Sequence, residues 1–206
     1  MKDQIRPAVV SLLAFTVILG LVYPLLMTGI AHALFSHQAT GSLIHDKNGK
    51  VVGSELIGQP FDNPAYFFSR PTAQANYNAS YSTGSNLGPT AFVDNEGNLG
   101  PNPALRKAVQ DRIDALRALD PGNTAPVPID LVTTSSSGLD PHISPAAAYY
   151  QAGRIARLRG QSKDDIDQMI ASHTEGRTLG VLGEPRVNVL GLNRALDERF
   201  GPVPDR

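Results

Sequence analysis

The segment at residues 133–145 brings together the side-chain types of a serine hydrolase within a short stretch. It reads TTSSSGLDPHISP and contains several hydroxyls, the carboxylate of Asp140 and the imidazole of His142. A nucleophile, a base and an orienting carboxylate are the parts of an acyl-transfer site. However, the chain has neither a G-x-S-x-G motif nor a glycine run for an oxyanion hole. We therefore interpret Asp140-Pro141 as a turn and Ser144-Pro145 as the start of a helix, and predict no catalytic residue.

Metal and phosphoryl chemistry have equally little support in the sequence. His142 and His173 lie in neither an H-E-x-x-H motif nor a Cys/His cluster, and the chain has no cysteine. Asp46–Lys50 is similar to the D-K-T-G-T phosphorylation motif of P-type ATPases, but Asn and Lys replace its two threonines. We interpret this segment as a tight hairpin in which Asn48-Gly49 supplies the positive φ angles. No metal site and no cofactor of its own are predicted.

An apolar segment near the amino terminus indicates whether the chain is anchored in a membrane. Pro7–Phe35 contains no Asp, Glu, Lys or Arg and is apolar on all sides. About 25 helical residues reach about 37 Å, which exceeds the roughly 30 Å of a hydrocarbon core. A cleaved signal peptide is the alternative, with Ala31–Ala33 as its cleavage site, but its apolar region usually runs only about 7–15 residues. We predict a retained transmembrane helix over 8–35.

Basic residues predict the orientation of this helix. Lys2 and Arg6 precede it, whereas the first basic residue after it is Lys47. Because positive charge stays on the cytoplasmic side, we expect residues 1–7 in the cytoplasm and residues 36–206 outside. The expected topology is therefore a single pass with an extracytoplasmic carboxyl-terminal domain.

Small residues within the predicted span are candidates for helix packing. Thr16 and Gly20 are four residues apart, as are Gly20 and Pro24, and Gly29 follows. Such positions allow helices to approach closely in lipid. Small residues are also common in membrane helices in general, so both interpretations stand. Pro24 removes a backbone donor, and we expect a kink there.

Charge and length limit the kinds of domain that the residues after the predicted span can form. Of the 18 Lys/Arg and 19 Asp/Glu, two basic residues and one acidic residue precede residue 7, which leaves a net charge of −2. That balance provides no basic face for nucleic acid. About 170 residues are enough for one domain with a respectable core.

Periodicity and capping signals predict an α+β fold: one amino-terminal transmembrane helix followed by a single extracytoplasmic domain of mixed helices and strands. Strands are indicated by short apolar runs, and helices by Asn or Ser caps followed by apolar stripes. The predicted strands cover residues 42–45, 51–57, 126–133 and 187–190; the predicted helices run from Asn102 to Asp120, from Ser144 to Gly160, from Ser162 to near Gly176, and over 192–200.

Two polar segments are predicted to form a docking surface for a partner. Residues 71–101 are rich in Gly and Asn with little periodicity, and residues 133–145 are similar. Binding residues are often on such loops, held by a rigid scaffold. The alternative is that their Asn and Asp side chains only bond neighbouring amides. The candidate contacts are Arg70, Asn78, Asn86 and Asp140.

The sequence resembles the C subunit of the Kdp potassium-transporting ATPase in several long motifs that occur in one order over nearly the whole chain. The matching segments are Arg6–Ala8, Gly20–Leu25, Gly53–Gln59, Tyr66–Pro71, Gly84–Pro89, Val127–Thr133, Ser137–Pro145 and Gly183–Leu190.

This resemblance implies a non-catalytic accessory subunit in the inner membrane of a bacterium. Its implied partners are a channel-like potassium-binding subunit, a P-type ATPase subunit and a small membrane subunit, which together handle K⁺ and ATP. The family's C subunit is described as an assembly factor and as a catalytic chaperone that raises the ATP affinity of the ATPase subunit.

The resemblance also implies a nucleotide-contacting loop. The family proposal invokes a likeness to L-S-G-G-Q, whose matching positions here are Ser82, Thr83, Gly84 and Ser85, following Tyr81. Thr83 replaces a glycine and Ser85 replaces the glutamine. A nucleotide-contacting regulator of the ATPase subunit is therefore an alternative function, and an anchored extracytoplasmic hydrolase that uses residues 135–142 is another.

Overall fold

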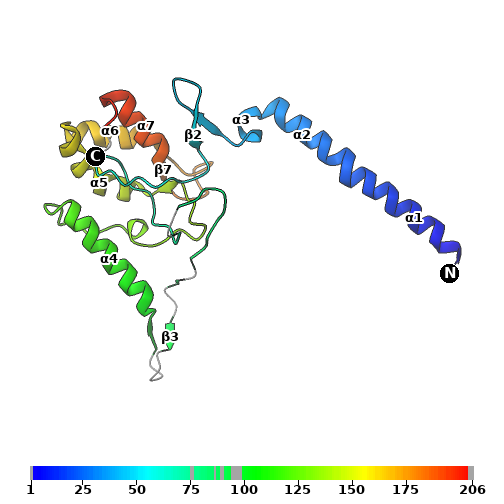
Figure 1. Cartoon of the computed structure of the whole chain (residues 1–206), viewed down its shortest axis with the longest axis horizontal. Helices are drawn as coiled ribbons and strands as arrows, with labels where there is room; N and C mark the ends of the chain where they lie inside the picture. Colours follow the sequence, from blue (N-terminus) through cyan, green and yellow to red (C-terminus); the bar gives the residue numbers. More distant parts are fainter. Residues whose placement is uncertain (1, 75–76, 86, 89–90, 94–98, 204–206) are drawn as a thin grey trace. The chain divides into compact units, whose positions relative to one another are not determined.

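The computed structural model describes residues 2–74, 77–85, 87–88, 91–93 and 99–203 (Figure 1). It divides into two compact units, Met1–Ser54 and Glu55–Arg206. The predicted boundaries after residues 7 and 35 refer to a membrane and stay predictions.

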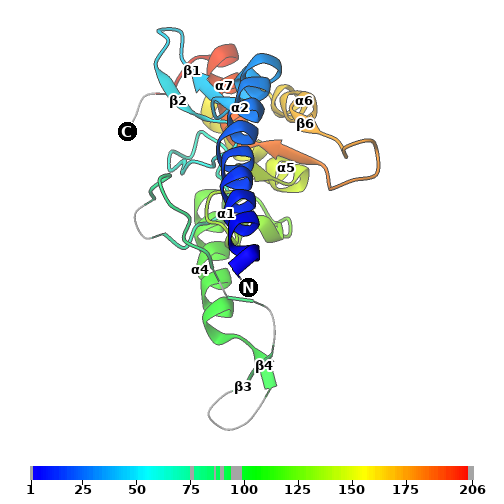
Figure 2. The ribbon, with the colours of Figure 1, turned by 90° about the vertical axis from the view of Figure 1, so that its right-hand side faces the viewer.

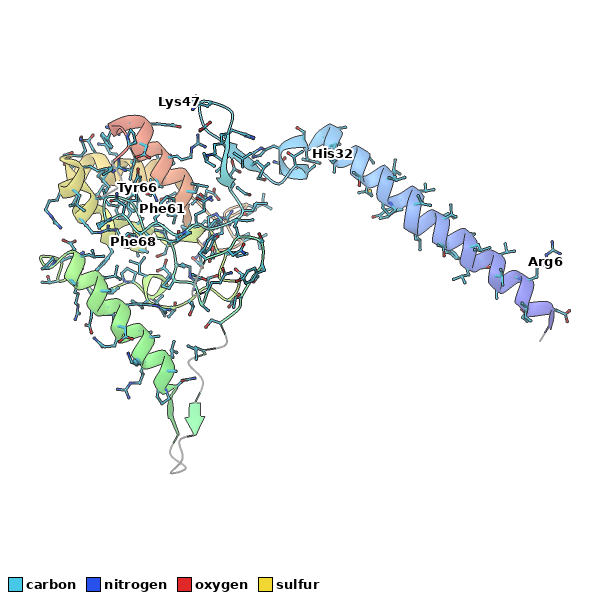
Figure 3. The ribbon with its side chains drawn as sticks, in the orientation of Figure 1. Arg6, His32, Lys47, Phe61, Tyr66 and Phe68 are labelled. Carbon is cyan, nitrogen blue, oxygen red and sulfur yellow. The ribbon has the colours of Figure 1, made fainter. Side chains whose placement is uncertain are left out.

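The first unit is dominated by a long apolar helix. Its span of 32 residues, Asp3–Leu34, is long and apolar enough to cross a bilayer, and none of its most apolar stretch is buried within the protein. Figure 3 shows its side chains projecting on all sides between Arg6 and His32. The helix consists of α1 (Lys2–Val17), the π-helical turn η1 (Ile18–Val22) and α2 (Tyr23–Leu34), and a short α3 (Ser36–Ala39) follows.

The π-helical turn accommodates Pro24. Proline has no N–H, and its ring crowds the carbonyl four residues earlier, which belongs to Gly20. The preceding residue, Tyr23, donates its N–H to Ile18 O, five residues back instead of four. A single widened turn therefore absorbs the effect of Pro24 without ending the helix.

The predicted hairpin is confirmed, with one correction to its turn. β1 (Leu43–His45) and β2 (Val51–Ser54) pair in antiparallel fashion. Asp46 shapes the turn because its Oδ1 accepts from the N–H groups of Asn48 and Lys50, at 2.8 and 2.9 Å. Gly49 has a φ of 78°, but Asn48 is not left-handed. The Asp46 bonds make a second left-handed residue unnecessary, and β2 ends at Ser54 because a turn follows.

The second unit confirms the predicted α+β class. A three-stranded antiparallel sheet in the order β5-β7-β6 packs with α5, α6 and α7 around a core that includes Phe67, Ile155, Ile170 and Leu192. Figure 2 shows α4 and the β3–β4 pair extending from this body. The elements are β3 (Ala91–Val93), β4 (Leu99–Pro101), α4 (Pro103–Leu119), the 3₁₀ turn η2 (Ile129–Leu131), β5 (His142–Ile143), α5 (Pro145–Arg159), α6 (Lys163–Ser172), β6 (Thr174–Glu175), β7 (Arg186–Asn188) and α7 (Val189–Phe200).

The predicted helix starts are confirmed by their caps. The side chains of Asn102, Ser144 and Ser162 each accept a hydrogen bond from an N–H in the first turn of α4, α5 and α6. Gly160, with a φ of 64°, ends α5 in the left-handed conformation that glycine tolerates.

One predicted strand and several predicted boundaries are wrong; among the boundaries, the last helix, α7, begins at Val189 and not at residue 192. Residues 126–133 are not a strand: Ile129–Leu131 forms a 3₁₀ turn, because the Asp130 carboxylate accepts from the N–H and Oγ of Ser144 at 2.6 and 3.1 Å. β7 ends at Asn188 because that side chain caps α7. α6 ends at Ser172, well before Gly176, and His173 caps it.

Candidate functional site

The predicted docking segments lie against each other with their backbones in close contact. Gly58 donates its N–H to Leu139 O at 2.8 Å, and a Cβ at Gly58 would lie 2.5 Å from Asp140 O. A Cβ at Gly84 would lie 2.9 Å from Ser136 O, and one at Gly138 would lie 3.0 Å from Thr83 O. Glycine thus allows three separate loops to meet at residues 136–140.

Arg70 and Asp140, two predicted contact residues, form an ion pair with each other. Arg70 Nη1 lies 3.0 Å from Asp140 Oδ2, and Arg70 Nη2 donates to Thr134 O at 3.3 Å. Asp140 Oδ1 accepts from the His142 N–H at 3.0 Å and lies 3.7 Å from His142 Nδ1. Burial would raise the pKa of the Asp140 carboxyl, but the hydrogen bonds from His142 and Arg70 outweigh it and lower the pKa to about 2.

Because of this ion pair, we expect the free energy of unfolding to depend on pH. Because the folded pKa of Asp140 lies below the ordinary 3.8, its stabilisation is present above about pH 4 and is lost as the pH falls towards 2. With the Asp140 side chain 30% exposed, we expect the loss to be about 1–2 kcal/mol. Urea unfolding of the Asp140→Asn variant in detergent, followed by the near-UV signal of the tyrosines, should lack this component.

Asp111→Asn is the matched control because, among the described residues, the ion pair of Asp111 is with Lys107 on the surface of α4. It should keep the pH dependence of the unmodified chain. Identical pH profiles for the unmodified chain and Asp140→Asn would contradict the assignment.

A pocket of about 320 Å³ adjoins the ion pair. Phe61, Phe68 and Tyr77 line it together with Arg70 and Asp140. Arg70 Nε is buried there without a hydrogen-bond partner among the described residues. The charges of Arg70 and Asp140 largely neutralise each other, so the pocket offers aromatic surface, neutral hydrogen-bonding groups and the carboxylate of Asp62.

The hydroxyls that a hydrolase would use are engaged in folding the turn. Ser135 Oγ accepts from the Gly138 N–H, and Ser137 Oγ accepts from the Leu139 N–H, both at 3.1 Å. The His142 ring lies beside Asp140 instead. These bonds favour the interpretation of the segment as turn chemistry.

The candidate nucleotide residues lie in the same loop contact. Ser82 Oγ donates to Ser137 O at 2.6 Å, and Thr134 Oγ1 donates to Ser85 Oγ at 3.3 Å. The backbone of Thr83 and the α-carbon of Gly84 face residues 136–138. Each of the four therefore has a local role in joining the loops, and their contact with nucleotide stays a prediction.

The other two candidate contacts are Asn78 and Asn86. Asn78 Oδ1 accepts from the Ser80 N–H at 2.8 Å, which is the local backbone role that the sequence left open. Asn86 lies outside the described residues. Whether any of the four contacts a partner stays a prediction.

The sequence did not reveal how residues 64–68 are held. The Phe67 N–H donates to Asn193 Oδ1 at 2.8 Å, and Asn193 Nδ2 donates to Phe67 O at 3.0 Å. Gln151 Oε1 accepts from the Phe68 N–H at 2.8 Å. Side chains of α5 and α7 thus replace a neighbouring strand.

Two arginines of α5 complete the support of this segment. Arg154 donates to the carbonyls of Pro64 and Tyr66 and lies 4.2 Å above the Phe68 ring. Burial lowers the pKa of Arg154 to about 10. Arg159 pairs with Asp197, which also accepts from the Tyr66 hydroxyl, at 2.9 Å in each case. Figure 3 labels Phe61, Tyr66 and Phe68 in this region. The polar residues of α5 and α7 were the only sign of this support in the sequence. Their partners at residues 64–68 are distant in sequence, so the contacts could not be predicted.

Among the described residues, no three or more His, Asp or Glu side chains are grouped so that they could hold a metal ion. The helix-packing candidates Thr16, Gly20, Pro24 and Gly29 are exposed along α1, η1 and α2. Their packing role stays a prediction.

Comparison with known proteins identifies close relatives. A family model described as "KdpC: K+-transporting ATPase, c chain" matches residues 5–198. Proteins from Methylococcus capsulatus and Sorangium cellulosum are each 57% identical over 199 residues, covering 96% of this chain and 98% of each relative. A protein from Variovorax paradoxus is 56% identical, with 96% and 97% covered. All three bear the name "Potassium-transporting ATPase KdpC subunit".

Proposed function

Because this chain belongs to the KdpC family and is a non-catalytic component of a potassium-transporting ATPase, we propose that it is an accessory subunit that docks on the outer face of that complex. Its apolar helix would anchor it in the bacterial inner membrane with residues 1–7 in the cytoplasm. The folded unit would support assembly and stability from outside. A potassium-binding subunit, a P-type ATPase subunit and a small membrane subunit would be its partners and would handle K⁺ and ATP.

The observation that carries this proposal is the pairing of an exposed apolar helix of 32 residues with a turn cluster whose hydroxyls serve the fold. The basic residues Lys2 and Arg6, which precede the uncharged segment 7–35, favour an outward domain. An outward domain has no access to cytoplasmic ATP. Any effect on the ATP affinity of the ATPase subunit would then be transmitted through the complex.

The pocket chemistry also disfavours direct nucleotide contact. Arg70 is paired with Asp140, and Asp62 adds a further carboxylate to the lining. Polyphosphates are bound by unpaired cations or by converging N–H groups. We therefore rank the nucleotide-contacting regulator below the docking subunit.

A single cysteine tests the proposed topology. Ser82 is exposed and the chain has no natural cysteine, so Ser82→Cys provides a unique thiol. We expect a membrane-impermeant maleimide to label it in spheroplasts without lysis. A cysteine replacing Gln4, which precedes the uncharged segment 7–35, is the control and should be labelled only after lysis. Labelling of position 82 only after lysis would overturn the proposal and favour nucleotide contact.

Co-purification tests the role of the anchor. The full chain, expressed with the other subunits, should retain them on affinity purification from detergent. A form lacking residues 1–35 should retain fewer of them. No retention by the full chain would defeat the proposed function.

A further inference from the structure

The loop between β6 and β7 presents apolar side chains to solvent in a fixed arrangement. Leu179 is 87% exposed, Val181 is 73% exposed and Leu182 is 60% exposed. Figure 2 shows this loop extending from the body that contains α5 and α6. We call these three residues the apolar tip. Exposed leucines and valines concentrated at the end of a projecting loop are typical of binding elements.

Hydrogen bonds hold the apolar tip in one conformation. Thr178 and Leu182 exchange backbone bonds at 2.9 and 3.0 Å, and the Val181 N–H reaches Thr178 O at 3.3 Å. Leu179 and Gly180 have consecutive positive φ angles of 54° and 77°, as in the tight turns of hairpins. Leucine is unfavourable in this conformation, where glycine or asparagine would be easier. The turn therefore keeps a large apolar side chain outward at a cost in conformational free energy.

The base of the loop is polar and electrically neutral. Arg177 pairs with Glu184 at 2.8 Å, and Arg186 pairs with Glu175 at 2.9 Å. An apolar centre surrounded by paired charges is the usual anatomy of a protein interface. A lipid-binding tip would instead carry unpaired basic residues or interfacial Trp and Tyr, and residues 174–188 contain neither aromatic residues nor an unpaired arginine. The charge pattern thus favours a protein partner over a lipid surface.

We infer that the apolar tip is a preorganised anchor that inserts into an apolar pocket on another subunit of the potassium-transporting ATPase. The inference rests on the proposed function, since it assigns a second contact to the same docking subunit. A rigid anchor binds with a smaller loss of conformational entropy than a flexible one. A few such buried side chains often provide most of the binding free energy.

A double variant, Leu179→Asn with Val181→Thr, tests this anchor. Asparagine tolerates positive φ and threonine has the shape of valine, so the turn is kept while its apolar character is lost. In the full chain expressed with its transporter, we expect the dissociation constant for the other subunits to rise about tenfold or more. The unfolding midpoint of the isolated chain should not fall, because asparagine is easier than leucine at the positive φ of residue 179.

Ile129→Thr is the matched control, because Ile129 is 74% exposed on η2 and outside the apolar tip. It should retain the other subunits as the unmodified chain does. If the unmodified chain itself retains no subunits, the proposed function fails. If the double variant retains them as well as the control does, only the anchor inference fails.

A photo-reactive residue replacing Val181 in the assembled complex identifies what the apolar tip touches. An adduct with another subunit supports the inference. An adduct with phospholipid, or no adduct, overturns it.

Discussion

Replacing Asn193 by Ala should lower the free energy of unfolding by about 3 kcal/mol. Asn193 is buried in α7 and makes two hydrogen bonds to the backbone of Phe67, at 2.8 and 3.0 Å. Alanine would leave a buried N–H and a buried C=O of Phe67 without partners. For a chain of this size, the loss corresponds to a decrease of about 6–12 °C in the unfolding midpoint. Thermal unfolding in detergent, followed by the near-UV signal of the tyrosines, measures it.

Glu198→Ala on the same helix is the control. Glu198 is exposed and reaches Arg194 only at 3.5 Å, so its loss should cost less than about 0.5 kcal/mol. Equal midpoints for the two variants would show that Asn193 does not hold residues 64–68.

Gly58→Ala should lower the free energy of unfolding by about 2–3 kcal/mol, because the loop at residue 58 packs closely against residues 139–140. The new methyl would lie 2.5 Å from Asp140 O and 3.0 Å from Asp140 C. Both are backbone atoms, so the clash cannot be relieved by rotating a side chain. The bond from Gly58 N–H to Leu139 O would have to lengthen, which would also displace Asp140 from Arg70. The same unfolding experiment measures the effect.

Gly176→Ala is the matched control, since its φ is not left-handed and nothing lies within 4 Å of the added methyl. It should be neutral or slightly stabilising, because alanine restricts the unfolded chain more than glycine does. If Gly58→Ala proves as harmless as this control, the close packing at residues 58 and 140 is not a constraint.

Local signals predicted the parts of the fold that local chemistry determines. Asn102, Ser144 and Ser162 cap helices because each side chain bonds an N–H two or three residues away. The hairpin around Gly49 is likewise determined by nearby residues, above all by Asp46. The apolar span also needs no knowledge of distant contacts.

Long-range contacts explain what the sequence could not predict. The strand expected over 126–133 has the right composition, but the Asp130–Ser144 bonds fix a 3₁₀ turn instead. The sequence predicts Arg70 and Asp140 as separate contact residues, yet only the fold shows that they pair with each other. The support of Phe67 by Asn193 joins residues 126 positions apart, and no local pattern reveals it. The same holds for the three glycine contacts, whose partners are also distant.

The π-helical turn Ile18–Val22 affects how a neighbouring helix can pack against this helix. An α-helix places 3.6 residues in each turn, so one additional residue displaces the helical phase by about 100°. Positions before Ile18 and after Val22 therefore belong to two stripes that point in different directions. A neighbouring helix that follows one stripe must leave it halfway along this helix, and two separate neighbours can each occupy one half.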